Sequence, residues 1–223
     1  MDEQIPDSPL SESDEVEGNT DWNDESDSGP KPIETERLIL RRFEEADAYR
    51  TYQLINDPEI AANTRTIPYP YPEELAVEWI RKHRGQWISG KGVVFAICCK
   101  PEFGAEPDSS AEEDGVTSQA YLVGAIGLQI SPENHNAEMG YWVGRDYRGK
   151  GYCTEAAAAL LEFGFEVLAL HRIHAHHLAR NPASGRIMEK LGMEKEGHMK
   201  QNVRKNGVFE DTVHYAIINP QKR

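Results

Sequence analysis

The segment at residues 136–170 constrains the fold most, because its residue pattern changes twice within a short length. Residues 138–143 combine aromatic and β-favouring side chains, which is typical of a strand. Residues 148–151 hold an arginine, a lysine and two glycines, and from Thr154 apolar residues recur with helical spacing. One apolar stripe consists of Ala156, Leu160, Phe163 and Val167. The pattern therefore predicts a strand, a basic glycine-rich turn and a mostly buried helix.

The turn at residues 148–151 predicts a binding site for an anion. A helix begins with backbone N–H groups that have no partner within the helix, and its dipole makes that end partly positive. Glycines just before the helix let the backbone approach a ligand closely or adopt a positive φ. A phosphate or pyrophosphate is the ligand that best suits such a corner.

The formal net charge of −14 is concentrated in two segments. Residues 1–30 hold eleven acidic side chains and residues 101–119 hold six, without any lysine or arginine, so the remainder carries +3. The low content of large apolar residues predicts a disordered acidic tail over residues 1–32 and a flexible acidic insertion over residues 101–119. A slightly basic folded part suits a polyanionic cofactor, and the sequence predicts no nucleic-acid partner because it has no basic stripe.

The three cysteines do not predict a disulfide framework. Cys98 and Cys99 are neighbours in a predicted strand and should face opposite sides of the sheet, and Cys153 lies far away in the sequence. Free cysteines favour a reducing compartment. The N-terminus has no signal-peptide pattern and the chain has no stretch of 18 apolar residues, so we expect a cytoplasmic protein with no membrane partner.

Strand and helix patterns alternate along residues 33–219, which predicts one domain with a mixed sheet and helices on both faces. The expected strands lie at residues 37–43, 92–99, 121–130, 138–143, 172–178, 196–203 and 210–218. The expected helices lie at residues 44–54, 72–87, 154–168 and 183–191.

Four local signals set the boundaries of these elements. Asn56-Asp57-Pro58 should end the first helix, and Gly192 should cap the last one. Asn206-Gly207 should form the turn of the final hairpin. The prolines of residues 66–72 exclude a helix or central strand, and the two tyrosines of this loop either line a substrate groove or pack the loop itself.

The hexapeptide Arg148-Gly-Lys-Gly-Tyr-Cys153 resembles the Arg/Gln-x-x-Gly-x-Gly/Ala motif of the GNAT superfamily of acetyl-CoA-dependent N-acetyltransferases. Further motifs resemble the RimJ/RimL branch of this family, in the family's order: Glu34-Thr-Glu-Arg-Leu-Ile-Leu-Arg41, Gly140-Tyr-Trp-Val143, Lys150-Gly-Tyr-Cys-Thr-Glu-Ala156, His171-Arg-Ile173, Asn181-Pro-Ala-Ser184 and Glu189-Lys-Leu-Gly192. The resemblance implies an α/β fold with a largely antiparallel mixed sheet of about seven strands, helices on both faces and a splay between the fourth and fifth strands.

The same resemblance implies where acetyl-CoA binds. The pantetheine arm would lie between the strands at residues 138–143 and 172–178, with the pyrophosphate at the glycine turn. Backbone groups of Trp142 and Val143 would pair with the arm, and Ser184 would lie beside the thioester sulfur. The cofactor-binding residues implied in this way are Trp142, Val143, Arg148, Gly149, Lys150, Gly151, Tyr152, Cys153, Thr154, Asn181 and Ser184.

Two positions depart from the family pattern. Cys153 stands where the motif has glycine or alanine, and we interpret it as a packing residue rather than a nucleophile. Met188 stands where many members have a tyrosine that protonates the leaving thiolate, and a thioether has no proton to give. Ser184 is therefore the candidate catalytic acid, directly or through water, unless the thiolate leaves unassisted.

Glu138 is the first candidate for the general base. An acceptor amine is largely protonated at neutral pH and must lose a proton before it attacks the thioester. The alternative is a structural carboxylate that is hydrogen-bonded to a neighbouring loop. Asp211 and His214, on the last strand, are weaker candidates for the base.

Four histidines crowd the segment at residues 171–177. Alternate residues of a strand face opposite sides, so His174 and His176 are separated from His177 by the sheet. No carboxylate or cysteine follows at ligand spacing, and we therefore expect no metal site.

The favoured function is acetyl-CoA-dependent transfer of an acetyl group to a primary amine, by a monomer or homodimer. The RimJ/RimL resemblance favours a protein N-terminal α-amine over a small-molecule amine. A non-catalytic acyl-CoA-binding regulator is the alternative, because the acid and base are not fixed by the sequence. A nucleotide-binding protein of another class is less compatible, because the glycine turn matches neither a P-loop nor a dinucleotide-binding fingerprint.

Overall fold

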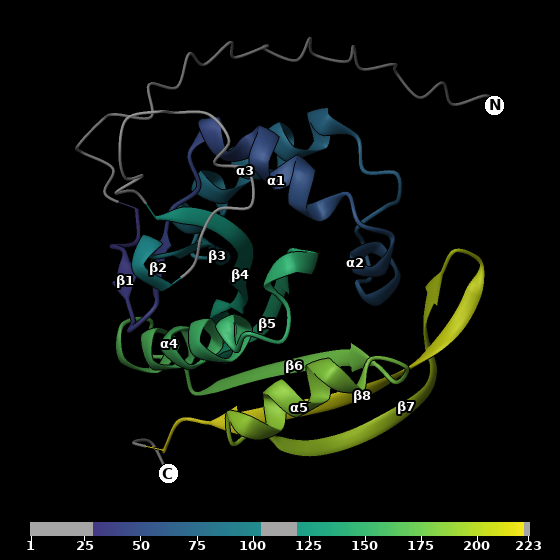
Figure 1. The fold of residues 1–223 in the computed structure, drawn as a ribbon. Coiled ribbons are helices and arrows are strands. Elements are labelled where there is room, and N and C mark those ends of the chain that lie inside the picture. The colour runs from purple at the N-terminus through teal and green to yellow at the C-terminus, as the bar shows by residue number, and fades with distance from the viewer. Residues whose placement is uncertain (1–28, 104–119, 221–223) are drawn as a thin grey trace, which may run out of the picture.

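The computed structural model describes residues 29–103 and 120–220 (Figure 1). The strands are β1 (Ile33–Glu34), β2 (Leu38–Arg41), β3 (Gly92–Cys99), β4 (Tyr121–Ser131), β5 (Asn136–Val143), β6 (Arg172–Leu178), β7 (Glu194–Lys205) and β8 (Val208–Ile218). The helices are α1 (Ala48–Ile55), α2 (Pro58–Asn63), α3 (Glu73–Ile88), α4 (Tyr152–Glu166) and α5 (Pro182–Lys190), with short 3-10 helices η1 (Glu45–Asp47), η2 (Pro101–Phe103), η3 (Pro132–Asn134) and η4 (Arg145–Tyr147). Residues 1–28 of the predicted tail and residues 104–119 of the predicted insertion fall outside the described residues.

The strands form one sheet in the order β1-β2-β3-β4-β5-β6-β8-β7. All neighbouring strands are antiparallel except β5 and β6, which are parallel. Residues 136–138 of β5 pair with residues 172–174 of β6, after which the two strands separate. The predicted splay is confirmed. The sheet has eight strands rather than about seven because the two-residue β1 also pairs with β2.

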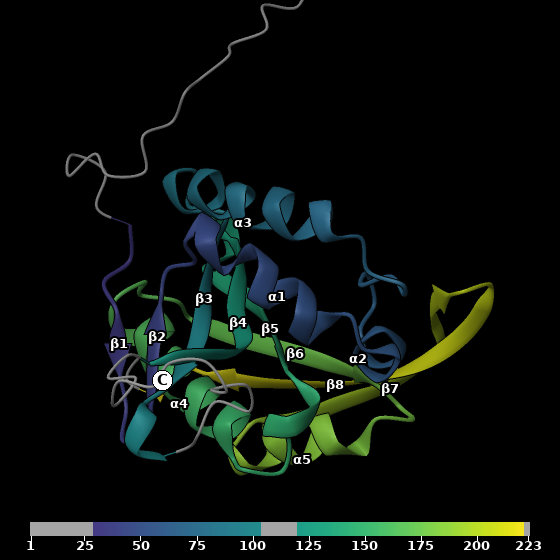
Figure 2. The ribbon, with the colours of Figure 1, turned by 45° about the horizontal axis from the view of Figure 1, so that its top comes forward.

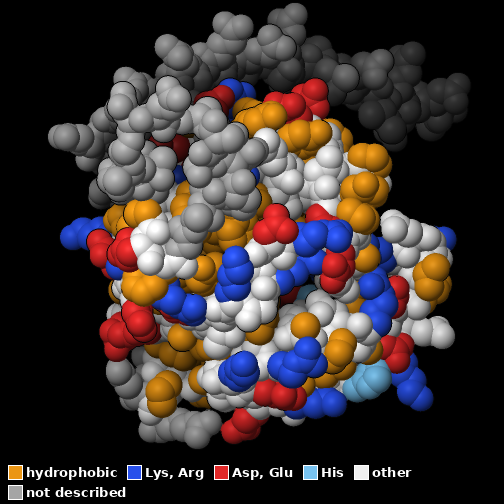
Figure 3. Space-filling view, in the orientation of Figure 1, with side chains coloured by type: hydrophobic (Ala, Val, Ile, Leu, Met, Phe, Trp, Pro, Cys, Tyr) orange, Lys and Arg blue, Asp and Glu red, His pale blue; other side chains and the backbone are white. Residues whose placement is uncertain are grey.

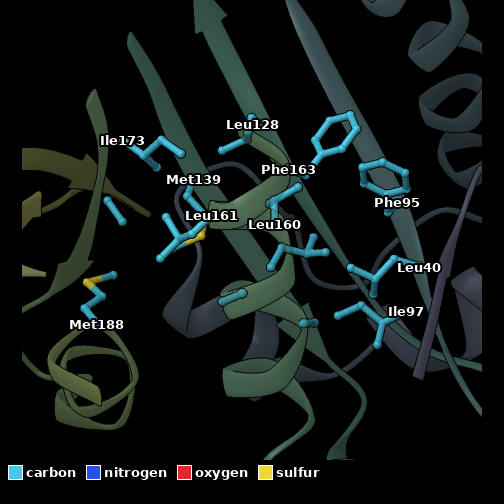
Figure 4. Packing of buried hydrophobic residues seen from close by; sticks show 14 of the residues in the cluster. Leu40, Phe95, Ile97, Leu128, Met139, Leu160, Leu161, Phe163, Ile173 and Met188 are labelled. Carbon is cyan, nitrogen blue, oxygen red and sulfur yellow. The ribbon is translucent and has the colours of Figure 1, made fainter. Parts of the chain in front are cut away.

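Helices cover both faces of the sheet, as predicted, with α1 and α3 on one side and α4 and α5 on the other (Figures 1 and 2). On the α4 side, Leu160 is fully buried and the ring of Phe163 meets that of Phe95 edge-on at 5.5 Å (Figure 4). Burying side chains of this size contributes about 1.5–3 kcal/mol each. Cys98 belongs to the core under α1 and α3 and Cys99 to the core under α4, so the predicted alternation is confirmed.

The region around α1 and α2 differs from the prediction. The expected helix at residues 44–54 begins as η1 and becomes α-helical only at Ala48, because the Asp47 carboxylate accepts the Glu44 N–H at 2.8 Å and caps the turn. The Asn56-Asp57-Pro58 signal ends α1 but also starts α2, which was not predicted. Asp57 accepts the Glu59 N–H at 2.8 Å and Pro58 occupies the first helical position, where its missing N–H costs nothing.

The buried helix α4 begins earlier and ends earlier than predicted. It ends at Glu166, and Val167 is 64 % exposed instead of extending the buried stripe. The end is set by a hydrogen bond from the Leu170 N–H to the Gly164 carbonyl at 3.0 Å, together with a positive φ of 52° at Ala169.

As predicted, the last helix ends at a glycine, and an Asn-Gly turn joins the last two strands. Gly192 follows α5 with φ of 74°. Asn206 and Gly207 have φ of 48° and 84° and join β7 to β8, which is the geometry of a tight hairpin turn.

The β7–β8 hairpin fastens the segment between α2 and α3. Lys205, at the end of β7, donates from Nζ to the Ile67 carbonyl at 3.3 Å. From outside the hairpin, Arg180, which follows β6, donates to the Ala62 carbonyl of α2 at 2.5 Å. The proline-rich segment at residues 66–72 contains no helix or strand, as predicted. Tyr71 in this segment is buried, whereas Tyr69 is 56 % exposed.

The two ring nitrogens of His83, on α3, are buried and have no hydrogen-bond partner among the described residues. Its ring packs against Trp79 at 4.4 Å and against Phe43 at 5.3 Å. Burial lowers the pKa of His83 to about 4. The unfolded chain, with an ordinary histidine pKa of about 6.5, therefore binds more protons between these values, so this group reduces stability as the pH falls.

We expect His83→Phe to make the free energy of unfolding less dependent on pH. Between pH 7 and pH 5 the wild type should lose about 1–2 kcal/mol more stability than the variant, because only the wild type must keep a neutral imidazole in an apolar site. Urea denaturation at both pH values measures the difference. Equal losses in the two proteins would contradict the assignment.

Candidate active site

The gap between β5 and β6 opens into a cavity of about 380 Å³. Past residue 138, β5 has no strand partner on its β6 side among the described residues, so the backbone of residues 139–143 faces the cavity. Side chains from α2 and α5 close the remaining walls. Seven of the predicted catalytic and cofactor-binding residues line this cavity: Glu138, Trp142, Val143, Arg148, Cys153, Asn181 and Ser184.

The glycine-rich turn lies at the start of α4, as predicted. Gly149 and Gly151 have φ of 74° and 85°, which side chains rarely tolerate. A Cβ at Gly149 would meet no atom within 4 Å, so the backbone conformation rather than crowding accounts for glycine there. Tyr152 and Thr154 lie in the first turn of α4, whose N–H groups and dipole favour an anion.

Arg37 and Glu155 hold this turn in place, although the sequence analysis assigned them no role. The guanidinium of Arg37 pairs with the Glu155 carboxylate at 2.7 Å and donates to the Lys150 carbonyl at 2.9 Å. The Thr35 hydroxyl also bonds to Glu155, at 2.5 Å. Thr35 and Arg37 belong to one of the motifs that resembles the RimJ/RimL branch, which was the available signal.

The two cations of the turn occupy different environments. Arg148 pairs with Asp57 at 2.8 Å and with Glu59 at 2.6 Å, so two carboxylates already hold its guanidinium beside the cavity. Burial acts to raise the pKa of Asp57, but hydrogen bonds from Arg145 and Glu59 and the charge of Arg148 outweigh it and lower that pKa. Lys150 is exposed, with Nζ 5.5 Å from the Tyr147 ring.

A phenol lies beside Ser184. The hydroxyl of Tyr141, from β5, lies 2.9 Å from Ser184 Oγ and donates to the Ser184 carbonyl at 3.2 Å. Burial is the main cause that raises the pKa of Tyr141, so the phenol keeps its proton. Met188 is fully buried, whereas Tyr141, from a different element, has its hydroxyl beside Ser184.

Cys153 lies in the first turn of α4 and lines the cavity. Burial raises its pKa to about 12, so the thiol stays protonated at neutral pH. Because the thiolate is the reactive form, this environment favours a packing role over that of a nucleophile.

Glu138 occupies the last paired position before the strands separate, opposite His174 of β6. Its Oε1 lies 2.9 Å from Nδ1 of His176. The hydrogen bond to His176 is the main cause that lowers the pKa of Glu138, so the carboxylate is ionised at neutral pH. The partner is thus a neighbouring strand rather than a loop, and the alternation of residues along β6 was the signal that could have identified His176.

The structure places the two weaker candidates for the base, His214 and Asp211, in different surroundings. His214 stacks on His176 with ring centroids 5.2 Å apart, next to the Glu138 carboxylate. Asp211 instead binds His198 at 2.8 Å and the Gln201 N–H at 2.8 Å. Neither Asp211 nor His214 lines either of the two cavities.

A second cavity of about 530 Å³ lies on the α1–α3 side of β5. It shares Glu138, Gly140 and Trp142 with the first cavity, so β5 is a wall common to both. Tyr71, from the proline-rich segment, and Trp79 line its far side. On the face of the molecule shown in Figure 3, Lys and Arg side chains are interspersed with Asp and Glu. The arrangement allows two ligands to meet at β5 from opposite sides of the sheet.

These features define an acyltransferase, and the family model of the acetyltransferase (GNAT) domain matches residues 37–194. The chain belongs to this family, and the predicted resemblance to its RimJ/RimL branch is confirmed. It is 30 % identical over 190 residues to the uncharacterized N-acetyltransferase YnaD of Bacillus subtilis, covering 85 % of this chain and 98 % of that protein. It is also 28 % identical over 183 residues to spermidine N(1)-acetyltransferase of Vibrio cholerae, covering 82 % of this chain and 93 % of that protein.

Among solved structures, the fold matches that of RimL, a ribosomal L7/L12 α-N-protein acetyltransferase in complex with coenzyme A. The TM-score is 0.71 at 21 % sequence identity, and the match covers 84 % of this chain and 98 % of RimL. This likeness supports the GNAT fold assigned above.

Within residues 29–103 and 120–220, no three His, Cys, Asp or Glu side chains lie close enough together to hold a metal ion. In the same part of the chain, no helix combines the length and apolar character needed to cross a membrane.

Proposed function

We propose that this acyltransferase uses acetyl-CoA as its acetyl donor and transfers the acetyl group to a primary amine. The observation that carries the proposal is the continuity between the splayed strands and the glycine turn at the start of α4. An extended arm would fit between β5 and β6, and a pyrophosphate would fit the turn. The fit of these residues to CoA is supported by the positive φ values of Gly149 and Gly151 and by the unpaired side of β5.

The proposed donor site uses three sets of residues. Backbone groups of Trp142 and Val143 would hold the pantetheine arm, and the N–H groups of residues 148–154 would hold the pyrophosphate. Lys150 would add a charge-assisted contact to phosphate, and Arg148 would do so from its position between the two carboxylates. Asn181, at the start of α5, would bond the pantetheine, with Ser184 beside the sulfur.

When bound, acetyl-CoA supplies a thioester that an amine can attack directly. The Glu138 carboxylate would take a proton from the acceptor ammonium, directly or through water. A backbone N–H near Trp142 would stabilise the negative charge that develops on the acetyl oxygen. The hydroxyl of Ser184, with Tyr141 bonded behind it, would return a proton to the departing thiolate.

The second cavity is the proposed acceptor site, because it reaches Glu138 from the side opposite the donor. We favour a protein N-terminal α-amine as the acceptor, supported by the RimJ/RimL motifs and by the activity that the name of RimL states. A small polyamine is the second candidate. The glutamates at residues 59, 78 and 138, which line the two cavities, and the relative named for spermidine support it.

Donor binding and acceptor choice are tested together. Coenzyme A should raise the melting temperature, whereas ATP and NAD should leave it unchanged, because only a ligand that binds the native state stabilises it. Release of free thiol from acetyl-CoA should then be measured with three amines: a peptide with N-terminal alanine, its N-acetylated counterpart containing one lysine, and spermidine. Turnover of the first alone supports α-amine acetylation.

Two outcomes would contradict parts of the proposal. Fastest turnover with spermidine would replace the protein acceptor by a small amine. Binding of acetyl-CoA without turnover of any amine would favour the non-catalytic acyl-CoA-binding regulator instead. Five expectations from the sequence stay predictions: a cytoplasmic location, the domain limits at residues 33–219, the acidic tail and insertion, the absence of a nucleic-acid partner, and a monomeric or homodimeric state.

A further inference from the structure

Acetylation of an ammonium group releases one proton to solvent. The substrate nitrogen carries three protons, the amide product keeps one, and the thiol product takes one, so one must leave the site. We propose that Glu138 passes this proton to His176, which is held by His214 and releases it to water. The inference rests on the proposed function. It adds His176, which neither the family motifs nor the sequence assigned to catalysis, and it gives His214 a positioning role instead of that of a weaker base candidate.

The contact between Glu138 and His176 gives the route its first step. The Oε1 and Nδ1 atoms are 2.9 Å apart, which is hydrogen-bonding distance. Both side chains line the cavity between β5 and β6, which is the proposed donor site, and the side chain of His176 remains 18 % exposed. A proton that arrives on the carboxyl group therefore has an acceptor in contact and an exit to solvent beyond it.

His214 holds the imidazole of His176 from the other side. The rings stack with a centroid distance of 5.2 Å and an angle of 16° between their planes. His214 is fixed in turn by Thr212, whose Oγ1 lies 2.8 Å from His214 Nε2 and accepts a hydrogen bond from Asn202 at 2.9 Å. His214 is thus a positioning residue, because it acts through His176.

An irregularity in β7 builds this support. The pairing of β7 with β8 shifts between Met199 and Val203, and Gln201 has φ of 49°. The shift brings the side chain of Asn202 over the buried Thr212. A β-bulge of this kind re-aims a side chain, and here it completes the hydrogen bonds behind the histidine stack.

Titratable groups of β5, β6, β7 and β8 lie around His176. Its carboxylate partner from β5 is Glu138, and Arg172 of β6 is already paired with Glu196 of β7. Burial lowers the pKa of both His174 and His214, so these neighbours stay neutral. The remaining charged group that acts on Glu138 is Arg65, from the segment after α2.

The proton balance of the route is closed. The Glu138 carboxylate accepts a proton from the ammonium and passes it to Nδ1 of His176, which regenerates the carboxylate beside an imidazolium. The imidazolium then gives one ring proton to water and becomes neutral again. The second proton lost by the nitrogen goes to the thiolate through Ser184, so no other reactant is needed.

His176→Phe tests the route, because phenylalanine keeps a ring against His214 but cannot carry a proton. We expect kcat at pH 7 to fall about 10- to 100-fold, with the affinity for acetyl-CoA unchanged in calorimetry. The dependence of kcat on pH should also differ from that of the wild type, because the variant has no imidazole beside Glu138 to accept the proton. The assay uses the N-terminal alanine peptide or spermidine, whichever the wild type acetylates. His171→Gln is the control from the same segment, outside both cavities, and should match the wild type.

Further variants separate proton transfer from simple packing. Added imidazole should restore part of the activity of His176→Gly, which a purely structural role does not predict. His214→Phe should retain most of kcat and His214→Ala should lose several-fold without a change in KM. In the free protein, ring nitrogen NMR signals of His176 should change in Glu138→Gln and not in His171→Gln.

Two results would overturn the inference in different ways. A His176→Phe enzyme with the kcat and pH profile of the wild type would overturn the proton route and leave the proposed function intact. A wild type that binds acetyl-CoA but acetylates neither amine would overturn both.

Discussion

Glu138→Gln is expected to lower kcat by about 100-fold or more while leaving the affinity for acetyl-CoA unchanged, since general bases contribute about 10²–10⁴ to rates. The amide has the shape of the carboxylate but cannot take a proton from an ammonium group. Donor contacts are expected to survive because they lie along the glycine turn and the backbone of β5. Steady-state kinetics give kcat, and calorimetry with acetyl-CoA gives the affinity.

The ionisation of Glu138 sharpens this experiment. Its pKa is lowered mainly by the hydrogen bond with His176, so the wild-type carboxylate is charged at neutral pH and its charge is lost only in acid. Raising the pH should therefore reduce the defect of the variant only by deprotonating the acceptor amine, and not by changing the side chain at residue 138. Glu133→Gln is a suitable control, because Glu133 is an exposed carboxylate of η3, the short helix that precedes β5. Unchanged turnover in Glu138→Gln would disprove the assignment of the base.

Gly124→Ala is expected to have the largest effect on stability. A Cβ at this position of β4 would lie 2.3 Å from the Trp142 carbonyl oxygen and 2.9 Å from the Val143 Cα. Real side chains do not come so close, and the obstructing atoms belong to the backbone of β5, so strand β5 must move. Overpacking of this kind costs about 3 kcal/mol, which for a domain of this size corresponds to a fall in Tm of about 6–12 °C.

The same displacement should weaken donor binding, because β5 forms one wall of the donor cavity. Gly140→Ala is the matched control for stability. It is also a glycine of a central strand, but its Cβ would meet no atom within 4 Å. Scanning calorimetry of the two variants compares the effects. Similar Tm values for both would show that β4 and β5 can part at little cost.

Elements whose patterns are local followed from the sequence. The central strands β3 and β4 are mostly apolar runs. The turn before α4 is marked by two glycines whose φ values are positive. The hairpin turn at Asn206-Gly207 is equally local. Each of these features depends on residues that are adjacent in the chain, so single-sequence reasoning could find them.

Features that depend on distant partners did not follow from the sequence. Tyr141 and Ser184 are 43 residues apart, and their hydroxyl groups meet only because α5 packs beside β5. His176 meets Glu138 because two parallel strands pair over three positions before they separate. The sequence identified Glu138 and Ser184 as candidates, but their partners are properties of the packed fold.

The short pairing between β5 and β6 divides the sheet into a five-stranded and a three-stranded half. Within each half the neighbouring strands pair with each other. At the seam between the halves, β5 and β6 pair only over residues 136–138 and 172–174. A ligand that lies in the seam and bonds to β5 would take the place of the missing strand. The groups that recognise such a ligand would then also join the two halves of the sheet. Ligand binding and the contact between the halves would therefore stabilise each other.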